Sequence, residues 1–169
     1  MKPKAIIVCN APANIDSVYT KEVLAELAEL TDLYPEIVTD LSQGDFKDVE
    51  YMFSTWGMLA PSEEERAAYV PNLKALFYGA GATDRFVRPF FARNIRVFSA
   101  WHANAIPVAE FSLAQILLAL KGYFLNTRDV HSKGWKGAFR GPGIYGDTVA
   151  LIGDGAISTK IQALLKNFN

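Results

Sequence analysis

The stretch Thr148-Val149-Ala150-Leu151-Ile152-Gly153-Asp154-Gly155-Ala156-Ile157-Ser158 combines a buried-strand pattern with a glycine turn. Apolar residues at helical spacing follow it from 156 to 168. A strand, a glycine turn and a helix in this order are typical of a dinucleotide-binding site. Gly153 would permit the tight turn, and Gly155 would let the backbone approach a pyrophosphate. The N-terminus of the helix would add unpaired N–H groups and a positive dipole end.

Two residues depart from the usual glycine pattern of such a turn. Ser158 stands where a third glycine normally allows close packing of the helix on the strand. Asp154 places a carboxylate beside the predicted phosphate site, which is unfavourable unless the side chain points away or caps the helix. An ordinary strand-to-helix turn without a ligand is therefore the alternative interpretation.

Upstream of this turn, the first hundred residues alternate short apolar runs with segments of helical spacing. Thr20 is placed to cap one helix, Ser62 and Glu65 form a capping box for a second, and 83–94 is expected to form a third. Such alternation predicts an α/β fold with a doubly wound parallel sheet, flavodoxin-like, in the strand order 2-1-3-4-5. The five expected strands are 5–9, 36–39, 51–55, 75–78 and 96–99.

A long helix is expected to join this sheet to the glycine turn. Pro107 suits the first turn of a helix, and apolar residues then recur from Val108 to about residue 131, with a possible break at Gly122. The glycine-rich segment 134–146 reads as a linker. We therefore expect a domain over 1–103, followed over 104–169 by an interdomain helix, the linker and the start of a second domain.

Composition narrows the functional classes. The net charge of −1 gives no attraction to nucleic acid or to an anionic membrane. Cys9 is the single cysteine, so no internal disulfide can form, and a reduced thiol in a cytoplasmic protein is expected. The apolar stretch 105–120 is interrupted by Glu110, Ser112 and Gln115, which predicts a soluble protein rather than a membrane span. No metal-ligating cluster is apparent.

Three stretches together resemble the D-isomer-specific 2-hydroxyacid dehydrogenases: 72–81 (NLKALFYGAG), 104–110 (NAIPVAE) and 146–157 (GDTVALIGDGAI). The resemblance implies a flavodoxin-like substrate-binding (lid) domain, a long helix and the first strand, turn and helix of a Rossmann domain. It also implies an NAD(P)-dependent oxidoreductase that transfers hydride between nicotinamide and a 2-oxo or 2-hydroxy acid.

The same resemblance implies roles for individual residues. The backbone of Gly79, Ala80 and Gly81 would face the substrate carboxylate, and Asn104 would lie near the substrate. Val108 would lie near the nicotinamide, while Gly153, Gly155, Ala156 and Ile157 would contact the cofactor, NAD or NADP. The helix from Val108 would pack across the two-fold axis of a homodimer.

By this resemblance, the catalytic residues of the family would follow position 169. No catalytic residue is therefore assigned here. We expect the 169-residue chain to be truncated inside the NAD-binding domain, to bind the cofactor weakly and to be inactive alone. An alternative function is a non-catalytic flavodoxin-like module for binding or dimerisation. A Rossmann protein of other chemistry, such as a methyltransferase, agrees less well with 104–110.

Overall fold

The computed structural model describes residues 1–134 and 141–168. It divides into two compact units, Met1–Trp101 and His102–Asn169, which are considered separately here. The predicted domain boundary at residue 103 stays a prediction.

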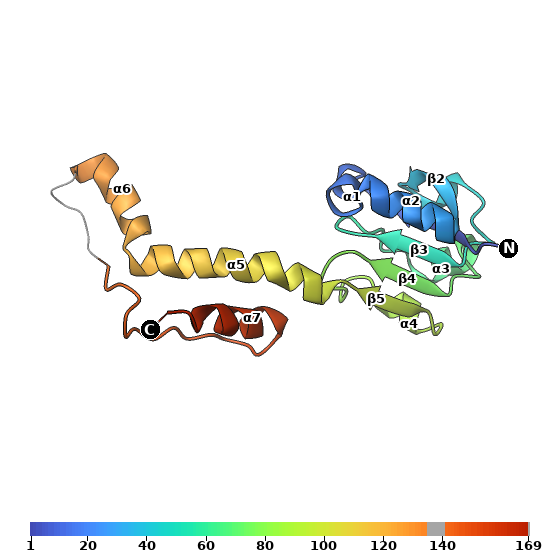
Figure 1. Ribbon diagram of the computed structural model, residues 1–169. Coiled ribbons are helices and arrows are strands. Elements are labelled where there is room, and N and C mark those ends of the chain that lie inside the picture. The colour runs from blue at the N-terminus through green and yellow to red at the C-terminus, as the bar shows by residue number, and fades with distance from the viewer. Residues whose placement is uncertain (135–140, 169) are drawn as a thin grey trace. The chain divides into compact units, whose positions relative to one another are not determined.

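The first unit is built on a parallel sheet of five strands (Figure 1), in the order β2-β1-β3-β4-β5. This result confirms the predicted α/β class and strand order. The strands are β1 (Lys4–Val8), β2 (Asp32–Val38), β3 (Tyr51–Ser54), β4 (Ala75–Tyr78) and β5 (Arg96–Ser99).

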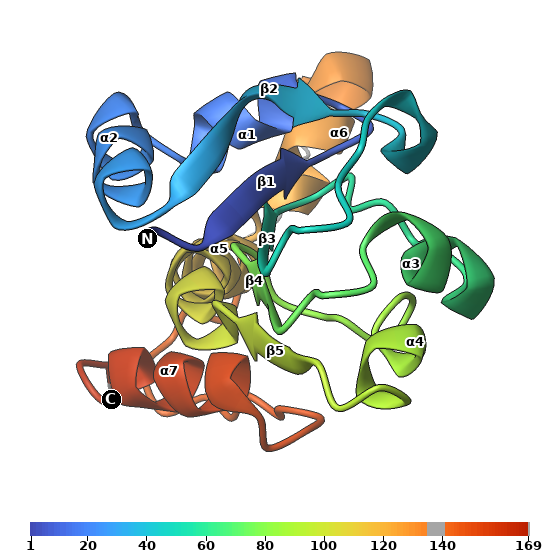
Figure 2. The same ribbon diagram turned by 90° about the vertical axis from the view of Figure 1, so that its right-hand side faces the viewer.

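Helices lie on both faces of this sheet, as a doubly wound fold requires. Figure 2 shows α1 (Ala13–Val18) and α2 (Lys21–Leu30) on one face, with α3 (Glu63–Tyr69) and α4 (Arg88–Phe91) on the other. The predicted caps are confirmed. The Thr20 side chain accepts a hydrogen bond from the Val23 N–H, and Ser62 and Glu65 form a complete capping box.

Alternating strand residues supply two cores, one on each face. In β1, Ile6 and Val8 join the core under α3 and α4, whereas Ala5 and Ile7 join the core under α1 and α2. Burial on both faces explains why the central strands read as continuous apolar runs rather than as alternating ones.

Three features of the first unit differ from expectation. The segment 83–94 forms only the single turn of α4, and the short helix α1 gave no clear sequence signal. Strand β2 begins at Asp32 and passes through Pro35, with a register irregularity against β1. Proline is tolerated there because β2 lies at the edge of the sheet, where an N–H need not be paired.

Within residues 102–134 and 141–168, the second unit has three helices: α5 (Trp101–Leu120, beginning at the unit boundary), α6 (Tyr123–Lys133) and α7 (Ala156–Leu165). The break at Gly122 is confirmed, since this glycine caps α6 with a positive φ of 73°. The expected start at Val108 is wrong. The helix begins at Trp101, and Pro107 lies inside it, because the alanine-rich residues before the proline continue the helical pattern. Residues 135–140 of the predicted linker lie outside the described residues.

The expected strand over 148–152 is also wrong, because these residues are not in a strand. The ladder hydrogen bonds of a strand come from a neighbouring strand, and none lies beside this segment among the described residues. Helix α7 forms nonetheless, since its hydrogen bonds are internal.

Helix α5 is apolar enough to be tested as a membrane span. Its length and composition alone would allow it to cross a bilayer. A single helix of this kind is weak evidence for insertion, because the core helices of soluble proteins share these properties.

Candidate functional site

The turn Gly79-Ala80-Gly81 follows β4 at the carboxyl edge of the sheet, where ligands bind in open parallel α/β folds. The Gly79 N–H donates to the Ser54 carbonyl at 2.7 Å and so continues the β3–β4 ladder. The Gly79 N–H is therefore already paired, and it is not a free donor for a substrate carboxylate.

Glycine is required at position 79 because the neighbouring chain approaches closely. An added Cβ would lie 2.8 Å from Val18 Cγ1 and 3.3 Å from the Tyr19 hydroxyl oxygen. Any side chain there would push α1 and its following turn away from the sheet.

Ser99, the last residue of β5, fixes the orientation of this turn. Its hydroxyl lies 2.9 Å from the Ala80 carbonyl oxygen and 2.5 Å from that of Gly81. In a trans peptide the N–H of the next residue points opposite to the carbonyl. The N–H groups of Gly81 and Ala82 consequently point away from Ser99, and neither has a hydrogen-bond partner among the described residues.

This geometry refines the sequence-based site. The predicted roles of Ala80 and Gly81 stay predictions, but the donors available in this turn are shifted one residue toward Ala82. Sequence reasoning missed Ser99 and Ala82. No local motif marks Ser99, because its two acceptors lie 18 and 19 residues earlier in the chain.

An apolar cavity of about 340 Å³ lies beside Gly79 and Ser99, within the first unit. Phe77 is one of its lining residues, and its ring stacks on Phe53 at 5.2 Å and on Phe98 at 5.0 Å between ring centroids. The cavity is lined by Tyr19, Leu27, Phe53, Phe77, Tyr78, Gly79, Phe98, Ser99 and Ala100. It offers apolar contact next to the turn that carries the free amides.

Tyr19 lines this cavity and also makes a hydrogen bond beside the Gly79–Gly81 turn. Its hydroxyl donates to the Ser54 carbonyl at 2.9 Å, the same oxygen that accepts the Gly79 N–H. Burial raises the pKa of Tyr19 to about 12, partly offset by this hydrogen bond. The phenol therefore stays neutral at physiological pH and acts as a structural donor rather than an acid or base.

The loop after β3 is anchored to the loop after β1 at the same edge. The Trp56 carbonyl accepts hydrogen bonds from Asn14 Nδ2 at 2.8 Å and from the Cys9 thiol at 3.2 Å. The Trp56 side chain remains 49% exposed. Cys9 is fully buried, as expected, and its thiol also lies 3.1 Å from the Ala11 carbonyl oxygen. Its expected reduced, inert state stays a prediction.

In the second unit, Asn104 and Val108 are four residues apart on α5, so they lie on one face of that helix. Val108 is exposed and Asn104 is half-buried. These positions are compatible with a shared ligand surface, and their predicted roles stay predictions.

The glycine turn before α7 leaves room for a ligand. Gly153 has a φ of +102°, which other residues rarely adopt, and Gly155 is the N-cap of α7. A Cβ on either glycine would meet nothing within 4 Å. No side chain caps α7, so the N–H groups of Ala156 and Ile157 are unpaired among the described residues. A phosphate fits the charge and geometry of such a helix end.

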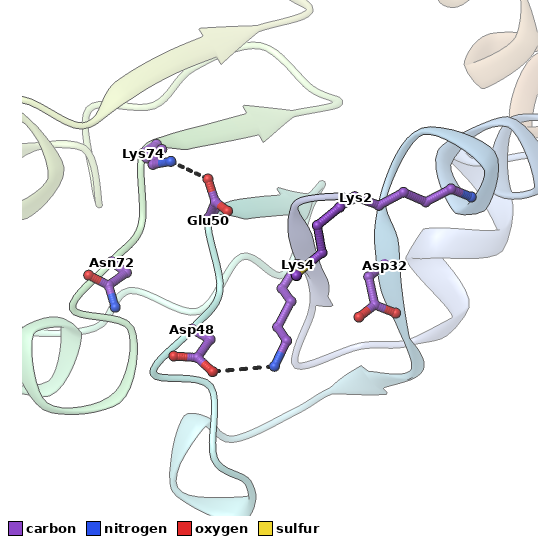
Figure 3. A pocket seen from close by; sticks show the side chains of 8 residues that line it. Lys2, Lys4, Asp32, Asp48, Glu50, Asn72 and Lys74 are labelled. Atoms are coloured by element: carbon purple, nitrogen blue, oxygen red, sulfur yellow. Dashed lines mark hydrogen bonds and ion pairs between the residues drawn. The ribbon is translucent and has the colours of Figure 1, made fainter.

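A third polar region, at the amino ends of the strands, has ordinary surface chemistry. Figure 3 shows a cavity of about 460 Å³ in which Lys4 pairs with Asp48 at 3.3 Å and Lys74 pairs with Glu50. Lys4, Asp48 and Lys74 are more than half exposed and Glu50 is partly exposed, so both pairs contribute little to stability. Opposite charges balance there, and the location is away from the carboxyl edge. Across residues 1–134 and 141–168, no group of three or more His, Cys, Asp or Glu side chains could hold a metal ion.

Solved structures of 2-hydroxyacid-type dehydrogenases and reductases are similar to this chain. An NADPH-dependent glyoxylate/hydroxypyruvate reductase from Sinorhizobium meliloti, in complex with NADP and malonate, has a TM-score of 0.68 at 21% identity, over 99% of this chain and 51% of that one. A glyoxylate reductase from Paecilomyes thermophila gives a TM-score of 0.71 at 17% identity, over 99% and 54% of the two chains.

A D-2-hydroxyisocaproate dehydrogenase gives a TM-score of 0.70 at 21% identity, over 98% of this chain and 50% of that one. No family model and no curated protein matches the sequence. At these identities the similarity establishes a shared fold. The chain spans about half the length of the solved structures it matches.

Proposed function

We propose that this chain is the substrate-binding and early cofactor-binding portion of an NAD(P)-dependent oxidoreductase of the D-2-hydroxyacid dehydrogenase type. The reaction is hydride transfer between nicotinamide and a 2-oxo or 2-hydroxy acid. The protein is proposed to be soluble and cytoplasmic.

The observation that carries this proposal is the Gly79–Gly81 turn. Ser99 holds its carbonyls, so the N–H groups of Gly81 and Ala82 form a preorganised pair of donors. Neutral N–H donors fixed before binding recognise a carboxylate without a reorganisation cost. The similar Sinorhizobium structure contains malonate, a small dicarboxylate.

The cofactor proposal rests on the turn before α7. Because Gly153 and Gly155 have no side chains, a pyrophosphate could approach the backbone closely. The N–H groups of Ala156 and Ile157 would bind it. Val108 and Asn104 on α5 would contact the nicotinamide and the substrate. When bound, NAD or NADP supplies or accepts the hydride. The chain's own residues bind and orient the two ligands.

The chain alone is proposed to be inactive, because none of its residues is assigned to transfer the proton. The experiment follows oxidation of NADH and NADPH by the 169-residue chain with glyoxylate, pyruvate and hydroxypyruvate. We expect no turnover and a cofactor dissociation constant in the millimolar range, about −4 kcal/mol of binding free energy. Turnover at roughly 1–1,000 per second would contradict the inactivity.

The substrate site is tested by titrating glyoxylate or pyruvate into the chain and into its Ser99→Ala variant. Loss of the hydroxyl should weaken binding of the oxo acid, because the N–H donors of Gly81 and Ala82 lose their fixed orientation. An unchanged dissociation constant would remove the turn from the substrate site.

Self-association is the proposed state of the chain, as a homodimer. Helix α5 exposes large apolar side chains, with Phe111 65% exposed, and residue Ile152 before α7 is fully exposed. Apolar surface of this extent is typical of interaction sites. This observation also supports the second candidate function, a non-catalytic dimerisation module. Light scattering should give at least twice the 18.7 kDa chain mass, and a monodisperse monomer would contradict this proposal.

A further inference from the structure

The apolar cavity beside the Gly79–Gly81 turn takes no part in the proposed binding of the substrate carboxylate. Among its lining residues are Phe53, Phe77 and Phe98, whose rings stack in a row across three adjacent strands. Phe98 is 48% exposed although it lies within strand β5. An exposed apolar surface of this kind is typical of a binding site for an apolar group.

The lining of this cavity is unsuited to a charged or polar group. None of the described residues that line it carries a charge. The hydroxyls of two lining residues already have partners: Tyr19 donates to the Ser54 carbonyl, and the Ser99 hydroxyl lies against two carbonyls of the turn. A polar ligand group would lose its hydration here without gaining a partner from these side chains. The cavity therefore suits an apolar group.

The alternation of side chains along β5 places this cavity on a defined face of the sheet. Val97 packs against the core under α3 and α4, and Ser99, two residues later, projects to the same face. Phe98 projects to the opposite face, where its ring stacks on Phe77. Phe77 packs against the core under α1 and α2, so the cavity lies on that side of the sheet.

The unpaired N–H groups of the turn point to the same side. The Ser99 hydroxyl holds the carbonyls of Ala80 and Gly81 on the α3–α4 side of the sheet. In a trans peptide, the N–H groups that follow these carbonyls, those of Gly81 and Ala82, point the opposite way. Gly79 belongs both to the turn and to the cavity lining. Two hydrogen-bond donors and an apolar cavity thus adjoin each other on one side of the sheet.

We propose that this cavity holds the apolar side chain of a 2-oxo acid while the N–H groups of Gly81 and Ala82 bind its carboxylate. The substrate class is then a 2-oxo acid with an aromatic side chain, such as phenylpyruvate. The inference rests on the proposed function, from which it takes the carboxylate site. A ring placed beside Phe77 and Phe98 extends their stacked row, an arrangement that aromatic rings favour. The two donors beside the cavity favour a small carboxylate over a second copy of the chain as the occupant.

The experiment follows the backbone amide NMR signals of the isotope-labelled whole chain during titration with phenylpyruvate, pyruvate or 2-phenylethanol. Phenylpyruvate carries the carboxylate and the ring, pyruvate lacks the ring, and 2-phenylethanol lacks the oxo acid group. We expect phenylpyruvate to bind about tenfold more tightly than pyruvate, because an apolar group in a fitting cavity contributes a factor of this order. We expect 2-phenylethanol to bind more weakly than phenylpyruvate, and equal binding of these two would overturn the inference.

The same titrations separate this inference from the proposed function. If phenylpyruvate and pyruvate bound equally and both shifted the amide signals of Gly81 and Ala82, the inference would be overturned and the carboxylate site would stand. If neither compound shifted these signals, the carboxylate site would fail, and the proposed function and the inference with it. Binding that weakens as the protein concentration rises would assign the cavity to a second copy of the chain and would also overturn the inference.

Two substitutions test the cavity directly. Phe98→Ala removes a ring that is about half exposed, so the first unit should stay folded while the preference for phenylpyruvate over pyruvate is lost. Ala100→Leu instead fills part of the cavity and should have the same effect. Neither substitution should change the affinity for pyruvate. A retained tenfold preference in either variant would overturn the inference, even if the other variant failed to fold.

The matched control is Phe91→Ala, because Phe91 is 58% exposed and belongs to α4, on the other face of the sheet (Figure 2). This substitution removes the same ring at a similar exposure, away from the cavity. It should leave the affinities for phenylpyruvate and pyruvate unchanged. A loss of preference as large as that in Phe98→Ala would overturn the assignment to the cavity.

Discussion

Short apolar runs of the kind that predicts a strand occur in both units, but they form strands only in the first. In the first unit, Ile6 and Leu76 are completely buried in parallel strands that have neighbours on both sides. In the second, Val149 and Leu151 belong to an equally apolar run that forms no strand. The buried hydrophobic residues of the second unit, among those described, are Ala105, Ala109 and Ile161.

The difference shows which elements a segment can form by itself. A helix satisfies its own backbone, so α7 exists without a sheet to cover. A strand exchanges hydrogen bonds with another strand, so the run before Gly153 needs partners from elsewhere. The core of the first unit should therefore dominate the measured stability of the chain.

The largest test of this comparison is a pair of Phe→Ala substitutions, one in each unit. Phe90 is fully buried against the sheet, whereas Phe111 on α5 is mostly exposed. Phe90→Ala should lower the free energy of unfolding by about 3–5 kcal/mol, from lost burial and the cavity left behind. At protein concentrations low enough to keep the chain monomeric, Phe111→Ala should change it by less than about 0.5 kcal/mol.

Urea unfolding followed by circular dichroism measures both variants. If Phe111→Ala destabilised the chain as much as Phe90→Ala, Phe111 would be buried in solution and the contrast between the two positions would fail. Light scattering on the same samples separates a loss of stability from a loss of self-association.

The sequence predicted the parts of the fold that depend on local or repeated patterns. Strand order followed from the alternation of elements, and the caps at Thr20 and Ser62 followed from adjacent residues. The sequence-based prediction failed where contacts with distant parts of the chain decide the secondary structure. Pro35 argues against a strand unless that strand is known to lie at an edge, and residues 148–152 read as a strand although no partner is beside them.

A second pair of substitutions compares two glycines with similar backbone conformation. Gly57 has a φ of +92° and Gly153 a φ of +102°. A Cβ on Gly57 would lie 2.6 Å from Asn10 Oδ1 and 2.9 Å from Cys9 Sγ, whereas one on Gly153 would meet nothing. Gly57→Ala should therefore combine backbone strain with overpacking and cost about 3 kcal/mol.

Gly153→Ala carries the backbone strain alone, in a segment outside the core, and should leave unfolding of the first unit unchanged. The two midpoints in urea give the comparison directly. Equal losses would mean that the strain, not the packing, dominates at both positions.

In the candidate site, too, the sequence predicted residues that belong to short local patterns and missed residues that act on distant parts of the chain. Gly153 and Gly155 were predicted from the short spacing of the turn, and Gly79 and Gly81 from the family resemblance. The contribution of Ser99 was not predicted, because its hydroxyl contacts carbonyls 18 and 19 residues away in the chain. A lone serine in the sequence carries no sign of such a contact.

The smallest expected effect concerns Tyr19, whose pKa is raised from 10.0 to about 12 by burial in the first unit. A folded-state pKa above the unfolded value means that this contribution to stability is complete below pH 10 and is lost as the pH rises through 12. Two pKa units correspond to at most about 2.7 kcal/mol. Tyr19→Phe removes the titrating group, so the free energy of unfolding of this variant should fall less steeply between pH 10 and 12.

At neutral pH the same variant should be less stable by about 1 kcal/mol, through loss of the hydrogen bond to Ser54. Tyr145→Phe, at an exposed position of the second unit, is the control and should leave the neutral-pH stability unchanged. Parallel pH profiles for Tyr19→Phe and the unsubstituted chain would show that the Tyr19 phenol is not buried in solution.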